Sequence, residues 1–241
     1  NESKLSFQRE KAVRTSAELL RNSRIAFFPL DIRRMLKSSF SRQIRLIPYK
    51  NLDAASLREG ADETADPRTL SKDGFCMRIQ DMLLDLSSGP VISNVWNIYY
   101  NESSLQERIR FTLLHELGHV FLGHHQLLGI DSTAGMENLP QYREADIQAD
   151  QFSINALAPA PAVARLLWEH GFSCMKNGLE WRITNRNAPF LRNLGQDPDP
   201  IQLIMTAFHI SRIAATTRLR ELNSELQIWQ QLDSELYAYI E

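Results

Sequence analysis

The stretch from Arg110 to His125, RFTLLHELGHVFLGHH, constrains the fold of this chain more than any other. It holds four of the chain's six histidines within sixteen residues, and its apolar residues recur at the spacing of one helix face. Ser104, with Glu107 three residues later, forms a capping-box signature just before it. The sequence therefore predicts a helix from about Leu105 to Gly123, with the histidines on it and at its end.

The segment HELGH places His115 and His119 four residues apart, so their side chains project from nearly the same face of a helix. Both imidazoles can then reach one metal ion, and Glu116 lies near that face. In this HExxH arrangement two histidines hold zinc, and the glutamate takes a proton from water that the metal has acidified. The pattern predicts a zinc site with His115 and His119 as ligands and Glu116 as general base.

A tetrahedral zinc ion with one bound water needs a third protein ligand, and the sequence offers three candidates. His125 stands ten residues after His115, where one class of metalloproteases places its third histidine. That class requires a glycine at the position that Leu122 fills here. Glu144 and Asp146 are the other two candidates.

Glu144 and Asp146 lie on a second predicted helix, from about Tyr142 to Leu157. They are two residues apart, so they face opposite sides of the helix and cannot both bind the same ion. Asp146 and Asp150 are four residues apart, so one could bind the metal while the other orients a ligand histidine through its free ring nitrogen. This pairing favours Asp146 as the third ligand.

The rest of the pattern predicts further helices and a small sheet. Helices are expected at residues 8–22, after Pro29, and at about 162–170, 200–209, 212–222 and 225–240. Strands are expected at 44–50, 74–80 and 97–101, and the segment 171–199 reads as irregular.

Composition limits the classes of function. The net charge is -2, which offers no strong field for nucleic acid or an anionic membrane. The chain has two cysteines, no apolar signal sequence at its start and no apolar run long enough to span a bilayer. We therefore expect a soluble cytoplasmic protein that binds neither nucleic acid nor membrane.

Several stretches resemble the ImmA/IrrE family of zinc metallopeptidases. The matching segments, together with the first helix and FPLDIRRML, span most of the chain, and they read GFCMRI, IYYNESSLQERIRFTLLHELGHVFLGH, DIQADQFSINALAPA and FHISRIAATTRLREL. In this family the second zinc helix usually carries a glutamate as third ligand. Counting back from Phe152 and Pro159 places that position on Asp146.

The resemblance implies that His115, His119 and Asp146 bind zinc and that Glu116 is the general base. This sequence departs from the family pattern because aspartate is one methylene shorter than glutamate, so the second helix must approach the ion more closely. The departure keeps Glu144 as an alternative ligand. The resemblance also implies an α+β, mostly helical, zincin-like fold with a small twisted sheet and a carboxy-terminal helical shell.

The expected organisation is a metallopeptidase domain over residues 1–160 and a helical region over 161–241 packed on it. The expected activity, again from the resemblance, is zinc-dependent cleavage of a regulatory protein such as a transcriptional repressor. The segment NIYYN, residues 97–101, is a possible sheet edge for holding the substrate as an added strand.

The competing hypothesis is a non-catalytic module with a degenerate site, which acts by binding protein or DNA. The aspartate at the third position favours it. The two short helices predicted around Ile210 and Ser211 resemble a helix-turn-helix, and Arg212, Arg218 and Arg220 could contact phosphates. Packing in a helical shell explains the same pattern, and the slightly acidic chain makes nucleic-acid binding the weaker reading.

Overall fold

The computed structural model describes residues 2–25, 27–50, 73–85, 89–134, 141–177, 180–185 and 199–231. These residues form two compact units, one of residues 31–153 and the other of residues 1–30 together with 154–241. The units therefore divide the chain elsewhere than at residue 160. The domain boundary at residue 160 stays a prediction.

The unit of residues 31–153 contains a three-stranded sheet in the order β1-β3-β2, formed by β1 (Ile44–Tyr49), β2 (Gly74–Asp85) and β3 (Gly89–Asn101). β1 runs parallel to β3, and β2 runs antiparallel to it. The segment NIYYN is thus part of the central strand, whose two sides are already paired. Its predicted role as a substrate-docking edge is wrong.

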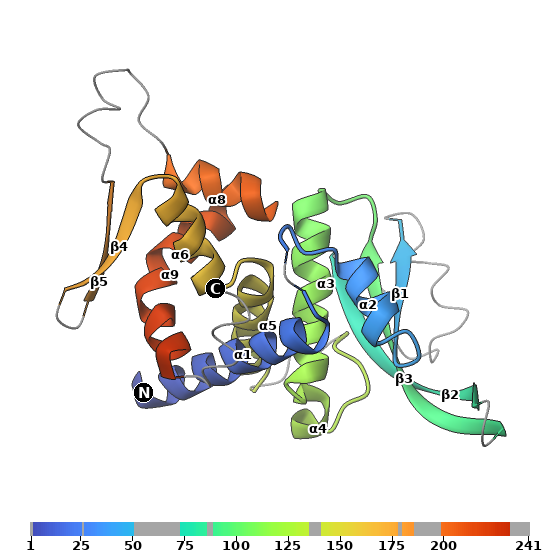
Figure 1. Cartoon of the computed structure of the whole chain (residues 1–241). Helices are drawn as coiled ribbons and strands as arrows, with labels where there is room; N and C mark the ends of the chain where they lie inside the picture. The colour runs from blue at the N-terminus through green and yellow to red at the C-terminus, as the bar shows by residue number, and fades with distance from the viewer. Residues whose placement is uncertain are drawn as a thin grey trace. The chain divides into compact units, whose positions relative to one another are not determined.

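Four helices belong to this unit: α2 (Ile32–Ser39), α3 (Gln106–Phe121), α4 (His124–Leu128) and α5 (Tyr142–Leu157), the last through Ser153. Figure 1 shows α3 beside the sheet, and this helix contacts both β3 and β2. The predicted capping box is wrong, because Leu105 is the N-cap residue of α3 and no side chain caps it.

The core of this unit lies between α3 and the sheet. Leu113, Leu114 and Leu117 of α3 are buried, as are Val95 and Ile98 of β3. Apolar burial on one side of α3 leaves its histidine-bearing side to face α5, which fixes the position of the candidate site in this unit.

α3 and α5 approach each other closely at Gly118. A Cβ atom added there would lie 3.1 Å from Cα of Ala149 and 3.2 Å from the carbonyl oxygen of the same residue. Any larger side chain at Gly118 would therefore push the backbone of α5 away from α3. This close approach is what a short aspartate on α5 needs in order to reach a ligand set on α3.

The other unit contains the helices α1 (Glu2–Asn22), α6 (Ala160–Glu169), α8 (Pro200–Phe208) and α9 (Arg212–Gln231). Two predictions for this unit are wrong. The segment expected to be irregular contains the hairpin of β4 (Phe172–Asn177) and β5 (Glu180–Asn185), and the helices expected at 212–222 and 225–240 begin as one continuous α9.

The predicted fold class is confirmed: the protein is a mostly helical α+β protein with a small mixed sheet. No helix among the described residues has the length and apolar character needed to cross a membrane.

Candidate metal centre

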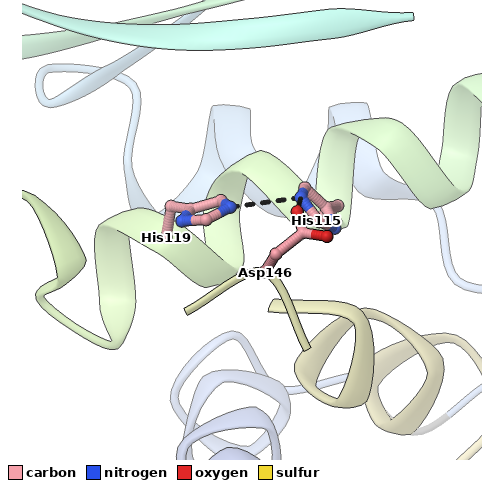
Figure 2. A group of neighbouring side chains, drawn as sticks. All are labelled: His115, His119 and Asp146. Carbon is pink, nitrogen blue, oxygen red and sulfur yellow. Dashed lines mark hydrogen bonds and ion pairs between the residues drawn. The ribbon is translucent and has the colours of Figure 1, made fainter. Parts of the chain in front are cut away.

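Three side chains from α3 and α5 bring ligand atoms together (Figure 2). Nε2 of His115 lies 3.1 Å from Nε2 of His119 and 3.2 Å from Oδ1 of Asp146. One ligand atom of each residue lies within 4.8 Å of the other two. Within the described part of the chain, this is the one set of three histidine, cysteine or acidic side chains that could hold a metal ion.

The spacing of these atoms fits a tetrahedral zinc ion. Two atoms that each lie about 2.0–2.1 Å from such an ion are about 3.3 Å apart, close to the two short distances at His115. Two imidazoles and one carboxylate are also a donor set that zinc accepts, with a fourth position left for water. His115, His119 and Asp146 therefore fit the metal that the sequence predicts.

The other two candidates for the third ligand do not join this set. Glu144 lies on α5 but is not in the group, and neither is His125. His125 lies elsewhere, with Nε2 at 3.3 Å from Sγ of Cys76 and its ring 4.3 Å from the ring of Trp96. Of the three candidates, Asp146 is the one whose carboxylate meets the histidine pair.

His115 is held from its other ring nitrogen by Asp150, whose Oδ1 lies 2.8 Å from Nδ1. Burial alone would lower the pKa of His115, but the hydrogen bonds with Asp146 and Asp150 outweigh it and raise the pKa to about 10. The pKa of Asp146 is lowered: burial would raise it, and the hydrogen bond with His115 reverses that effect. Before metal binds, these three groups thus form a partly exposed ionic hydrogen-bond network.

His124 and His125 do not end α3 as the sequence suggested. α3 ends at Phe121, and Gly123 adopts a φ of 74°, the left-handed conformation that glycine favours. The two histidines then begin the short helix α4, where both are buried. The His124 side chain therefore lies next to the metal ligand His119. The prediction that His124 ends α3 did not place it there.

Glu116 is buried beside the ligand set, with 5% of its surface exposed. The Thr133 hydroxyl donates a hydrogen bond of 2.9 Å to Oε2 of Glu116 and accepts one of 2.8 Å from the backbone N–H of Cys76. Burial raises the pKa of Glu116, and the charge of His115 and the Thr133 hydrogen bond oppose this rise. A raised pKa makes the carboxylate a better proton acceptor near neutral pH.

A cavity of about 320 Å³ opens beside these groups, within the unit of residues 31–153. Two of the three predicted ligands and the predicted base line it, together with residues of α3, α5, the start of β2 and nearby loops: Asp73, Gly74, Arg108, Phe111, Thr112, His115, Glu116, Thr133, Tyr142, Asp146 and Asp150. A cavity that reaches His115, Asp146 and the buried carboxylate of Glu116 can admit a substrate to them.

Thr133 and Tyr142 are the site residues that sequence reasoning missed. The hydroxyl of Tyr142 hydrogen-bonds to Asp146 one helical turn later on α5. A signal existed for Tyr142, since it precedes Asp146 by four residues on the same predicted helix. No sequence signal pointed to Thr133, because this residue reaches Glu116 only through the pairing of its loop with β2.

Replacing Gly118 by alanine is expected to weaken both the fold and the metal site. The added methyl group would meet α5 at Ala149, so we expect the free energy of unfolding to fall by about 1–3 kcal/mol. The shift would also carry Asp146 away from the histidines, so zinc affinity should fall in a chelator competition. Adding Asp146→Glu, with its longer side chain, should recover part of that affinity. Unchanged stability and affinity in Gly118→Ala would show that the two helices are not tightly packed there.

Comparison with known families identifies the family of the chain. The family model described as Peptidase_M78, IrrE N-terminal-like domain, matches residues 75–220, which is more than half of the chain and includes His115, Glu116, His119 and Asp146. A search of curated proteins finds no match. The resemblance read from the sequence is thus confirmed, and the chain belongs to the IrrE N-terminal-like domain family of M78 metallopeptidases.

Proposed function

We propose that this protein is a zinc-dependent endopeptidase that cleaves a regulatory protein, such as a transcriptional repressor. The observation that carries the proposal is the meeting of three ligand atoms next to a buried glutamate, with that glutamate and two of the ligands, His115 and Asp146, lining one cavity. The metallopeptidase family supports the reaction class. The choice of a repressor as substrate rests on the family resemblance alone.

Each residue of the site has a distinct role in this proposal. His115, His119 and Asp146 would hold the metal, which, when bound, supplies a Lewis acid that acidifies water and polarises the peptide carbonyl. Glu116 accepts the proton of the attacking water and delivers it to the leaving amine. Asp150 and Thr133 orient His115 and Glu116 through the hydrogen bonds at 2.8 Å and 2.9 Å.

Of the three arginines of α9 that could contact phosphates, Arg218 does not favour the competing DNA-binding reading. Arg218 is fully buried and pairs with Glu225, which is also fully buried. Burial lowers the pKa of Arg218 to about 9. Arg212 lies 3.7 Å from the carboxylate of Asp199. A side chain with no exposed surface cannot contact a phosphate, so Arg218 is excluded from DNA contact, whereas Arg212 and Arg220 are exposed.

A cleavage assay on a defined peptide library tests the reaction class without knowledge of the substrate. The zinc-loaded protein should release products that disappear with a chelator and return when zinc is restored. Metal analysis should find about one zinc ion per chain. A protein that holds zinc but releases no zinc-dependent products from peptides or from regulators encoded beside it would favour the non-catalytic module.

Thr133→Val should lower kcat by about tenfold or more while leaving zinc content unchanged. Valine keeps the shape of the side chain but cannot donate a hydrogen bond to Glu116, so the general base loses its orientation. Thr133→Ser retains the hydroxyl and serves as the matched control, with activity near that of the parent. Equal activity in the valine and serine variants would show that Thr133 does not orient Glu116.

A further inference from the structure

The metal ligand His119 directs one ring nitrogen at the ligand set and the other at a second histidine. Its Nδ1 lies 3.0 Å from Nδ1 of His124, and Nε2 of His124 lies 3.1 Å from Oε1 of Gln148. His119 is fully buried, and His124 is 2% exposed. The three residues form a continuous chain of hydrogen bonds that leads from α5 through α4 to the zinc helix.

The groups in this series of hydrogen bonds determine which nitrogen donates and which accepts at each step. The amide oxygen of Gln148 can only accept a hydrogen bond, so Nε2 of His124 carries a proton and donates it. A neutral His124 then has an unprotonated Nδ1, which accepts the Nδ1 proton of His119. His119 is left with its lone pair on Nε2, the atom that lies 3.1 Å from Nε2 of His115.

We propose that His124 and Gln148 are positioning residues for the metal ligand His119, and that they fix its ring orientation and its Nδ1–H tautomer before zinc binds. The inference rests on the metal site of the proposed function and extends it to two residues outside the ligand set. A ligand histidine loses about 10–100-fold in metal affinity when the partner of its other nitrogen is removed.

The two ligand histidines are therefore held by partners of different charge. His115 has the carboxylate of Asp150 at its Nδ1, whereas His119 has a neutral imidazole supported by a neutral amide. The exposed fractions explain the difference, since the Asp150 side chain is 49% exposed and His124 is buried. A second carboxylate at the depth of His124 would have to be desolvated, whereas the neutral chain avoids that cost.

The tautomer can be tested on the metal-free protein, without activity. Long-range ¹⁵N–¹H correlation spectra, assigned with single histidine variants, should show His119 protonated at Nδ1 and His124 protonated at Nε2. The same spectra of Gln148→Leu should show a mixture of tautomers at both rings. A parent His119 that is protonated at Nε2 alone would overturn the proposal.

Zinc affinity gives the second test, by chelator competition on four variants of the two residues and one control variant. His124→Phe and Gln148→Leu keep much of the side-chain volume but remove the hydrogen bonds, so each should bind zinc about 10–100-fold more weakly. His124→Asn and Gln148→Glu each keep an acceptor oxygen and should stay closer to the parent than their partner variants. Gln126→Leu, at an exposed position of α4, should match the parent.

The outcomes separate this inference from the metal site itself. If His119→Ala loses zinc while His124→Phe and Gln148→Leu bind it as tightly as the parent, the positioning role is wrong and the metal site stands. If His119→Ala binds zinc like the parent, the metal site is wrong and the inference falls with it. Should His124→Phe fail to fold, the NMR spectra of the parent and the zinc affinity of Gln148→Leu still test the positioning role.

Discussion

Glu116→Gln is expected to reduce peptide cleavage by about a hundredfold to ten-thousandfold, the contribution of a well-placed general base. Glutamine has nearly the same shape, and its amide oxygen can still accept the hydrogen bond of Thr133, so the buried position should remain filled. Zinc content should not change, because Glu116 is outside the set of ligand atoms that meet at His115. Initial rates and metal analysis on the same samples measure both effects.

Glu107→Gln is the matched control for this substitution. It makes the same chemical change on the same helix, but at an exposed position in the first turn of α3. Its activity should equal that of the parent. Full activity in Glu116→Gln would exclude Glu116 as the base, whereas loss of zinc in that variant would show that the carboxylate binds the metal.

The part of the site that lies on one helix could be predicted from the sequence. Helical geometry alone places His115 and His119 on one face, because it depends only on a separation of four residues. The same rule paired Asp146 with Asp150, and the structure places Asp150 at Nδ1 of His115. The spacing of residues in the sequence thus predicts which side chains share a face when the residues belong to the same helix.

The residues that reach the site from loops could not be predicted in this way. Thr133 contacts Glu116 only because its loop pairs with β2, where Met77 forms an antiparallel bridge with Ser132. His124 reaches His119 only because Gly123 turns the chain at the end of α3. Such contacts depend on backbone conformation and long-range pairing, and neither leaves a periodic pattern in the sequence.

The strands show the same division between local and long-range information. Alternating β-branched and aromatic residues predicted β1, the first part of β2 and the last part of β3, but neither the full length of β2 and β3 nor the order in which the strands pair. NIYYN therefore looked like a free edge although it lies between β1 and β2. Strand order is set by the packing of the whole unit, so it was not accessible from the segment itself.

Asp146→Asn is expected to weaken zinc binding by more than about a hundredfold. The substitution keeps the size of the side chain but removes the negative charge that lies 3.2 Å from Nε2 of His115. Losing a charged ligand should cost more than losing an outer partner of a ligand, which costs about 10–100-fold. Chelator competition measures the affinity. Glu144→Gln makes the equivalent change two residues earlier on α5, outside the ligand group, and should leave the affinity unchanged.

Asp146→Glu separates the identity of the ligand from the spacing of the helices. Glutamate is one methylene longer, and α5 lies so close to α3 that a Cβ on Gly118 would meet Ala149 at 3.1 Å. The longer side chain must fold back to reach the ion, so zinc should bind, but more weakly than to the parent. Combining it with Gly118→Ala, which moves the helices apart, should then improve binding relative to Asp146→Glu alone. If Glu144→Gln loses zinc while Asp146→Asn keeps it, the third ligand is Glu144, and α5 must be rotated relative to the arrangement in Figure 2.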